Sequence, residues 1–280
     1  MHKFSERMGF KEHLPIIQTD GMSDALRNSL WNFLHTLYEN TNNYWIPVAK
    51  LSARLFFKVP VDELPFHDSD NRKWLKARFY DLKWFEIYDY IEFIVNNHEL
   101  IIKYTNPSYT ELIEVFNIIF EEELSGFRFI SGILAPISNP AETGEISSAI
   151  EATARDGLAG AHEHLRASLT LLGKKPVPDY RNSIKEAISA VESIAKQLTI
   201  ADVQGLSGAL DELSKNVDIH GALKAGFIKL YGYTSDEDGI RHAILEQPNV
   251  GFDEAKYMVV SCSAFVNYLI AKAQKAHLLK

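Results

Sequence analysis

The sequence predicts a mainly α-helical protein with two domains: an N-terminal domain that is α with minor β, and a C-terminal antiparallel helical bundle. Apolar residues recur at helical spacing along most of the 280 residues, and this length suits two domains of ordinary size. All four tryptophans lie in the first half, whereas the second half relies on alanine, leucine, isoleucine and valine. These two core compositions predict two separate cores.

Three apolar runs at helical spacing predict helices in the N-terminal half. The first extends from Leu26 to Leu37, after the helix-start residues Ser23 and Asp24. The second, from Trp74 to Val95, is dense in aromatic residues. The third extends from Leu112 to Phe120 and ends in the acidic run 121–123, which we expect to be a solvated helix end.

A short β element and a domain joint are expected after the third run. Apolar residues alternate with their neighbours from Phe127 to Ala135, which predicts a strand or hairpin. In 138–144, Asn-Pro followed by Gly is a pattern that breaks helices and strands. We therefore expect domains at 1–140 and 145–280.

The C-terminal half has the periodicity of a helical bundle. An apolar stripe from Ile146 to Leu169 predicts a helix that ends near Gly173, and two prolines in 174–179 force a reversal. The stripe from Ile184 to Leu198 predicts an antiparallel partner. Further apolar patterns predict two short helices and a long last helix, at 206–215, at 220–230 and over Ala255, Met258, Cys262, Phe265 and Leu269.

Composition excludes several classes of protein. No apolar run is long enough to span a bilayer, the first residues lack the pattern of a signal peptide, and one cysteine cannot form an internal disulfide. These features predict a cytoplasmic protein without membrane contact. The net charge is −8: residues 1–145 hold 14 Lys and Arg against 21 Asp and Glu, and residues 146–280 hold 15 against 16. The N-terminal half is therefore expected to be a poor surface for RNA.

Two segments of the first half carry a family resemblance. FSERMGF (4–10) and LRNSLWN (26–32) resemble the fourth type of AbiJ N-terminal domain, a module of bacterial abortive-infection proteins. The resemblance implies an anti-phage protein in which this domain has a sensing or regulatory role.

Four segments of the second half resemble the HEPN domain of abortive-infection proteins. They are DYRNSIKEAISAVE (179–192), KLYGY (229–233), DGIRH (238–242) and AFVNYL (264–269). HEPN domains are small helical bundles that commonly dimerise, and many are toxin-like, metal-independent endoribonucleases. The resemblance implies a homodimer, a tRNA or mRNA substrate, no metal and no cofactor, with a possible antitoxin or phage-derived trigger as partner.

The same resemblance implies a catalytic pair, Arg241 and His242. Histidine titrates near neutral pH and suits transfer of the 2′-hydroxyl proton, while arginine stabilises charge on the phosphate. Arg181 and Asn182 are candidates for phosphate or base contacts. Glu192 is a candidate for orienting Arg241, as is Asp238 in the turn before the pair.

The sequence departs from the HEPN pattern at one point. That pattern places a histidine a few residues after the arginine, but positions 245–247 hold none, and His242 follows Arg241 directly. His242 is then either the acid/base group of a variant site, or the site has lost its histidine and the bundle binds protein, RNA or nucleotide without cutting. In a third interpretation Arg241 pairs with Glu186 or Glu192 inside the bundle and His242 caps the next helix.

Other candidate residues have simpler structural explanations. His162 and His164 are two apart on a helix and point to different faces, so we expect a solvated polar face rather than a metal site. Cys262 lies on an apolar stripe and is expected to be a buried, unreactive thiol. The aromatic residues Trp31 and 79–93 are expected to form core.

Overall fold

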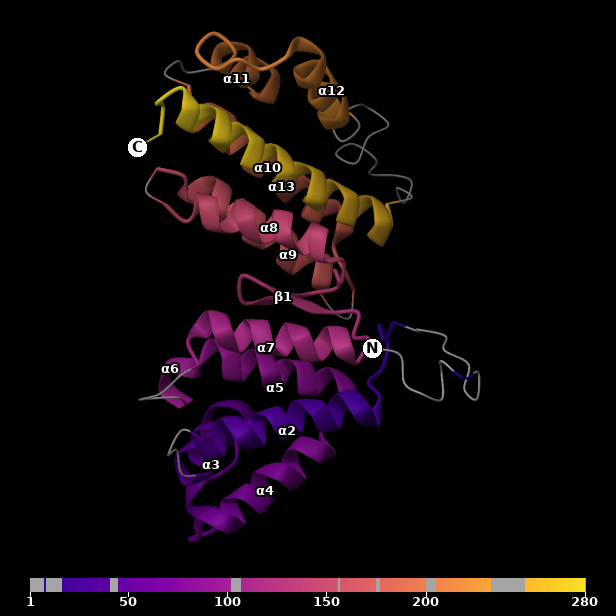
Figure 1. The fold of residues 1–280 in the computed structure, drawn as a ribbon, viewed down its shortest axis with the longest axis vertical. Helices are drawn as coiled ribbons and strands as arrows, with labels where there is room; N and C mark the ends of the chain where they lie inside the picture. Colours follow the sequence, from indigo (N-terminus) through magenta and orange to yellow (C-terminus); the bar gives the residue numbers. More distant parts are fainter. Residues whose placement is uncertain are drawn as a thin grey trace. The chain divides into compact units, whose positions relative to one another are not determined.

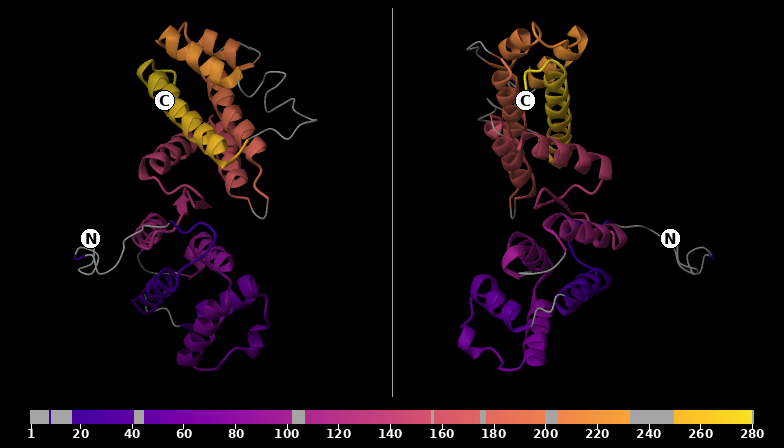
Figure 2. Two further views of the ribbon diagram at one scale, coloured as in Figure 1. Left: turned by 90° about the vertical axis from the view of Figure 1, so that its right-hand side faces the viewer. Right: turned by 60° about the vertical axis from the view of Figure 1, so that its left-hand side comes forward.

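The computed structural model describes residue 8 and residues 17–40, 45–101, 107–155, 157–174, 177–199, 205–232 and 250–279. The described residues are mainly helical, which confirms the predicted fold class (Figures 1 and 2). The chain divides into two compact units, Met1–Leu134 and Ala135–Lys280. Among the described residues, no helix has both the length and the apolar content needed to cross a membrane.

Unit 1 is a group of short helices around an aromatic core. Its elements are α2 (Asp24–Asn40), α3 (Trp45–Ser52), the π-helical turn η1 (Ala53–Phe57), the 3₁₀ turn η2 (Val61–Glu63), α4 (Asp68–Asp81), α5 (Trp84–Asn96), α6 (His98–Ile101), α7 (Tyr109–Glu122), and strands β1 (Arg128–Ile130) and β2 (Ile133–Ala135). Trp31 stacks on Trp45 at 5.9 Å between ring centroids, and Phe79 is fully buried. The prediction that Trp31 and the aromatic residues of 79–93 form core is confirmed for Trp31, Phe79, Tyr88 and Tyr90, whereas Phe85 is 45% exposed.

The run from Trp74 to Val95, predicted as one amphipathic segment, is two helices. Leu82 and Lys83 are extended between α4 and α5, and the Lys83 backbone N–H donates to the Glu86 carboxylate 2.7 Å away. This capping contact satisfies a donor that has no partner inside the helix, and so it starts α5. Periodicity alone could not detect the break, because apolar residues continue on both sides of it.

The predicted hairpin is confirmed as strands β1 and β2. The side chain of Asn117, on α7, accepts from the Phe129 N–H at 2.8 Å and donates to the Phe129 carbonyl at 3.0 Å. One amide side chain thus pairs with the backbone N–H and C=O of Phe129 on the free edge of β1, and it attaches the hairpin to α7. The preceding acidic run is not merely solvated, because the Glu123 carboxylate accepts from the Ser29 hydroxyl at 2.7 Å.

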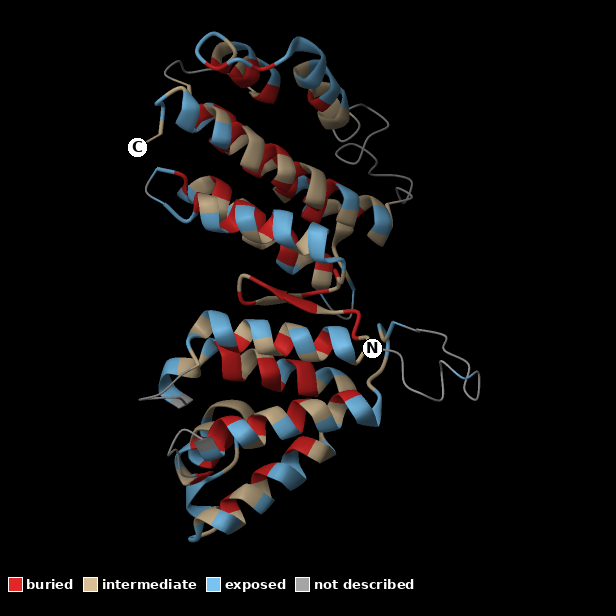
Figure 3. Cartoon of the chain, viewed as in Figure 1, coloured by how far each residue is buried: buried red, intermediate tan, exposed pale blue. Residues whose placement is uncertain are grey.

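Unit 2 is built on a ring of four helices. They are α8 (Pro140–Thr153), α9 (Ala159–Gly173), α10 (Tyr180–Gln197) and α13 (Phe252–Lys275), with α9 and α13 each packed against both α8 and α10. The Ser183 hydroxyl donates to the Ser168 carbonyl and the Asp179 N–H to the Leu171 carbonyl, so α9 and α10 are antiparallel. Two shorter helices, α11 (Gly205–Leu213) and α12 (Gly221–Gly232), follow α10. Buried residues gather on the inward faces of the four helices (Figure 3).

Two boundaries in unit 2 differ from prediction. The stripe from Ile146 to Leu169 is shared by α8 and α9, because the helix ends at Thr153 and Gly157 takes a positive φ of 85° that favours glycine. Residues 140–144, expected to break helices, form the first turns of α8. Asn139 caps that helix by accepting from the Ala141 N–H at 2.9 Å, and Pro140 is in the first turn, where its missing N–H costs nothing.

Candidate functional site

The predicted site residues fall into two groups. Asp238, Arg241 and His242 lie in 233–249, outside the described residues. Arg181 and Asn182 lie in the first turn of α10, and Glu192 lies three turns further along the same helix. The candidate site is therefore built from the N-terminal end of α10 and its neighbours.

Asp179 organises this end of α10. Its carboxylate accepts from the backbone N–H of Asn182 at 3.1 Å and from the Asn182 side-chain amide at 2.8 Å. The bond from the Asn182 side chain is the main reason that the pKa of Asp179 is lowered. Asn182, predicted as a substrate contact, thus already holds the helix cap, while the half-exposed Arg181 lies beside it.

The start of α13 lies beside the start of α10. The rings of Tyr180 and Phe252 contact each other at 6.3 Å between centroids. Val250 is the first described residue after 233–249, and Phe252 opens α13. The described chain therefore resumes, at Val250, close to the start of α10 and to Arg181.

The carboxylates of α10 have partners within the bundle. Glu192 pairs with Lys196 at 2.8 Å, and Glu186 pairs with Nδ1 of His164 on α9 at 2.6 Å. An imidazole whose Nδ1 is held by a carboxylate presents Nε2 for proton transfer, and Glu186 is one turn from Asn182. His164 is thus a described histidine with suitable chemistry near Asn182, although the sequence predicted only a solvated polar face at this position.

The two histidines of α9 have separate structural contacts. The ring of His162 lies 3.0 Å from the Ile150 carbonyl, at the C-terminal end of α8, whereas His164 faces α10. The prediction of different faces is confirmed, but His162 is half-buried rather than part of a solvated face. Among the described residues, no group of three or more His, Cys, Asp and Glu side chains is arranged to hold a metal ion.

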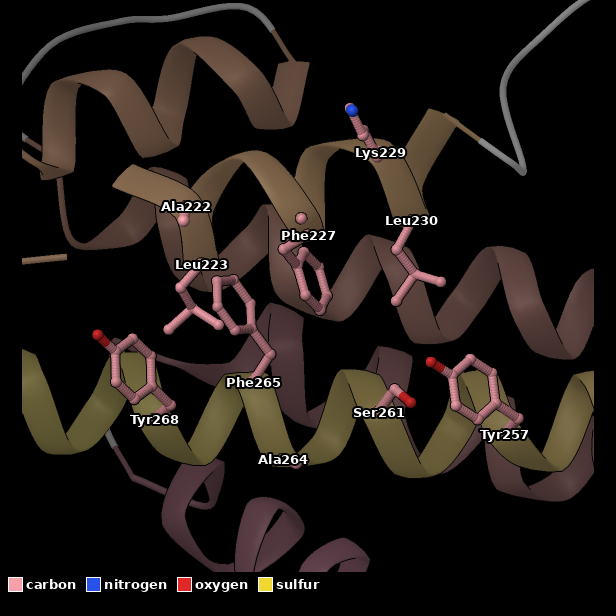
Figure 4. Close-up of a pocket in the computed structure, with 11 residues that line it drawn as sticks. Ala222, Leu223, Phe227, Lys229, Leu230, Tyr257, Ser261, Ala264, Phe265 and Tyr268 are labelled. Atoms are coloured by element: carbon pink, nitrogen blue, oxygen red, sulfur yellow. The ribbon is translucent and has the colours of Figure 1, made fainter. Parts of the chain in front are cut away.

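An apolar groove of about 750 Å³ is lined by residues of α12 and α13. Figure 4 shows Leu223 and Leu230 of α12 and Tyr268 of α13 around it, with the Phe227 ring of α12 against the Phe265 ring of α13. Tyr257 and Ser261 extend the wall toward the start of α13, while Lys229 points away from the groove. Apart from Lys229, the lining residues are uncharged.

Sequence patterns did not reveal this groove. The apolar residues of α12 and α13 predicted ordinary helix packing, which requires the two helices to be in close contact. In the structure Phe227 bridges to Phe265, but Leu223 remains 45% exposed and Tyr257 58% exposed. One sequence signal points to the groove: apolar residues occur around most of the circumference of α12. A helix that packs through one face needs only a single apolar stripe.

Cys262 has no role in a site. Its side chain is fully buried in α13, and burial raises the pKa of its thiol to about 12. The prediction of an unreactive buried thiol is confirmed, because the thiolate is the reactive form.

Comparison with known families decides the identity of the N-terminal part. The sequence model of AbiJ N-terminal domain 4 matches residues 2–152, which is more than half of the chain. The chain belongs to this family. No curated protein and no solved structure matches the chain.

Membership of the AbiJ N-terminal domain 4 family agrees with the resemblance found in the first half and points to a role in abortive infection. The matched residues cover unit 1 and nearly all of α8. Within the LRNSLWN segment, Leu26, Leu30 and Trp31 are buried on α2, so this part of the resemblance reflects the core of the domain. Of the FSERMGF segment, Met8 is described and is exposed.

Proposed function

We propose that this AbiJ-family protein is a cytoplasmic abortive-infection effector whose C-terminal bundle is a HEPN domain that cleaves RNA without a metal. In this proposal it acts as a homodimer, and its N-terminal domain restrains it until infection. A phage-derived trigger or loss of an antitoxin would release the activity. Family membership supports the defence role, and the resemblance of 179–192, 229–233, 238–242 and 264–269 to HEPN segments supports the nuclease.

The contact between Tyr180 and Phe252 carries the catalytic part of the proposal. It puts the half-exposed Arg181 at the end of the bundle where the chain returns from 233–249. Val250, where the described chain resumes, is two residues before Phe252. In this proposal Arg181 and the pair Arg241–His242 act together at this end of the bundle.

The proposed reaction is an intramolecular transesterification of the RNA phosphodiester. A neutral imidazole takes the proton of a ribose 2′-hydroxyl, the 2′-oxygen attacks the adjacent phosphorus, and the 5′-oxygen leaves with a proton from an imidazolium. The products are a 2′,3′-cyclic phosphate and a 5′-hydroxyl. Arg241 and Arg181 stabilise the charge on the phosphate oxygens, since guanidinium donors match their geometry.

The test is cleavage of total RNA or tRNA by the full-length protein in EDTA. We expect cyclic-phosphate ends, and a loss of about 100-fold or more in rate for His242→Ala and for Arg241→Ala. His277→Asn, which changes an exposed histidine outside the site, should cut normally. Cleavage that survives both site substitutions, or that requires magnesium, contradicts the mechanism.

His164 provides a second arm of the same experiment. If His164→Ala abolishes cleavage while His242→Ala does not, the acid/base role belongs to the imidazole held by Glu186. If neither substitution matters, the reaction does not use the histidines of this end of the bundle.

A second candidate function is binding without cleavage. The groove between α12 and α13 favours it, because an apolar, largely uncharged hollow of about 750 Å³ has the size and character of a ligand site. In this case the bundle binds a partner protein, RNA or a nucleotide. It predicts folded protein with no RNA turnover, and it fails if expression is toxic for the wild type but harmless for His242→Ala.

A further inference from the structure

Three cations follow one another along α3 and the π-helical turn after it. Lys50 and Arg54 are four residues apart and share the exposed face, opposite the buried residues Val48, Ala49 and Ala53. Their separation along the helix is one turn, about 6 Å. Lys58 is also exposed and ends the turn. We call Lys50, Arg54 and Lys58 the α3 basic row.

Among the described residues, Lys50, Arg54 and Lys58 take part in none of the ion pairs of the structure. By contrast, Lys73 on α4 pairs with Asp70 at 2.9 Å, and Arg72 pairs with Glu39 at 3.5 Å.

The backbone that carries the row is unusual. Ala53–Phe57 is a π-helical turn, a rare conformation that occurs frequently at functional sites. Lys58 takes the left-handed conformation, with a φ of 55°, which glycine or asparagine adopts at lower cost. Lys58 caps the turn in this conformation, with its backbone N–H donating to the Ala53 carbonyl, and this fixes where its side chain leaves the backbone.

An exposed aromatic ring is held beside α3. Phe66 is 96% exposed, yet its loop is fixed, because the buried Asn71 amide donates to the carbonyls of Pro65 at 2.6 Å and His67 at 3.0 Å. The loop lies at the N-terminal end of α3, where the Ile46 N–H donates to the Asp68 carboxylate. Both faces of this ring are therefore accessible to a ligand, and the ring contributes nothing to the core.

The charge of unit 1 is strongly segregated. Residues 45–85 hold eight Lys and Arg against five Asp and Glu, whereas the rest of 1–134 holds six against fourteen. Asp68 and Asp70 are already engaged, and the exposed acids nearest the row in sequence are Asp62 and Glu63. The negative net charge of residues 1–145 predicted a poor surface for RNA. That sum over the whole N-terminal half does not show that residues 45–85 are locally basic.

We propose that the α3 basic row and Phe66 form a binding site for single-stranded nucleic acid. The three cations contact successive phosphates, and the Phe66 ring stacks against a base, the combination by which proteins bind single strands without sequence preference. The site gives the N-terminal unit a direct function, namely capture of RNA, that does not depend on the nuclease proposed for the bundle.

The test measures binding of a fluorescent single-stranded RNA to the full chain by anisotropy. Arg241→Ala and His242→Ala are present throughout, with EDTA, so that cleavage cannot interfere. Replacing Lys50, Arg54 and Lys58 with Gln should weaken binding tenfold or more. The slope of log Kd against log salt should become less steep by about 2, because three phosphate contacts are lost. Phe66→Ala should weaken binding about tenfold, and Phe66→Trp should restore it.

The matched control is Lys215, Lys272 and Lys275 replaced with Gln, which removes the same charge from unit 2. The proposal is overturned if this control weakens binding as much as the row variant, or if the row variant binds RNA normally. It is also overturned if the row variant loses binding to phosphatidylglycerol vesicles but not to RNA. If binding depends on the row while the protein with Arg241 and His242 intact cleaves no RNA, the proposed nuclease is refuted and this inference stands.

Discussion

The rings of Phe227 and Phe265 stack 3.8 Å apart and within 10° of parallel. Phe227 is the buried side chain of α12, and the stack joins this helix to α13. The apolar groove lies around it, lined by residues of both helices. A Lys224–Asp211 ion pair at 2.8 Å attaches α12 to α11, but the stack is the buried contact that attaches it to α13.

Phe227→Ala should therefore release α12. We expect a loss of about 3 kcal/mol in the free energy of unfolding, from lost burial and the cavity left behind. Urea denaturation measures the loss, and amide hydrogen exchange should increase most in residues 221–232. Leu223→Ala, at a position 45% exposed, should cost less than about 1 kcal/mol. Equal effects of the two substitutions would show that the stack does not hold the helix.

Asn71→Ala should destabilise unit 1 through the loop that it clamps. The fully buried amide satisfies the carbonyls of Pro65 and His67, and its loss leaves both without that donor. We expect a cost of about 2 kcal/mol in thermal or urea unfolding. Lys73→Ala, which breaks an exposed ion pair on the same helix, should change stability by less than about 0.5 kcal/mol. A neutral result for Asn71→Ala would mean that the loop is not held by this side chain.

Asp179 should make stability depend on pH at the start of α10. Its pKa is lowered in the folded protein, first by the Asn182 side chain, so its contribution is present above the unfolded pKa of about 3.9 and is lost as pH falls through the folded value. Asp179→Ala should cost about 1 kcal/mol at pH 7, as lost N-caps do. Measured by urea denaturation, this difference should shrink below about pH 4. A difference that stays constant down to pH 2.5 would contradict the assignment, and Asp179→Asn, which cannot titrate there, provides the control.

Cys262 should be inert in the native protein. Burial raises its thiol pKa to about 12, so almost no thiolate exists at pH 8. We expect no reaction with a disulfide reagent such as DTNB within an hour, and one thiol per chain after unfolding in guanidinium. Rapid reaction of the native protein would show that α13 exposes this side chain.

Local patterns predicted most of the helices but not where they stop. Apolar spacing located α2, α7, α10 and α13, since each carries one continuous stripe. The breaks at Leu82–Lys83 and at Gly157 were missed because the apolar pattern continues across them. The Glu86 carboxylate, which caps α5, determines the first break, and the positive φ of Gly157 determines the second.

The candidate site was predictable only in part. The residue types expected for RNA chemistry were recognised by their resemblance to known segments, and Arg181 and Asn182 lie together on α10 as the helix spacing requires. The contact of Asn182 with Asp179 and the pairing of His164 with Glu186 were not predicted. The second of these joins residues on two helices, and sequence periodicity carries no information on which faces meet.

The sequence by itself determined the helical class, the two different cores and the membership of the AbiJ N-terminal domain 4 family, because these depend on composition, periodicity and local motifs. Only the tertiary structure decided that a groove opens beside the Phe227–Phe265 stack of α12 and α13, that Phe66 is held in solvent by Asn71, and that the α3 basic row remains unpaired among the described residues. The physical reason is that these features depend on distances between segments far apart in the chain, which are set by how whole helices pack.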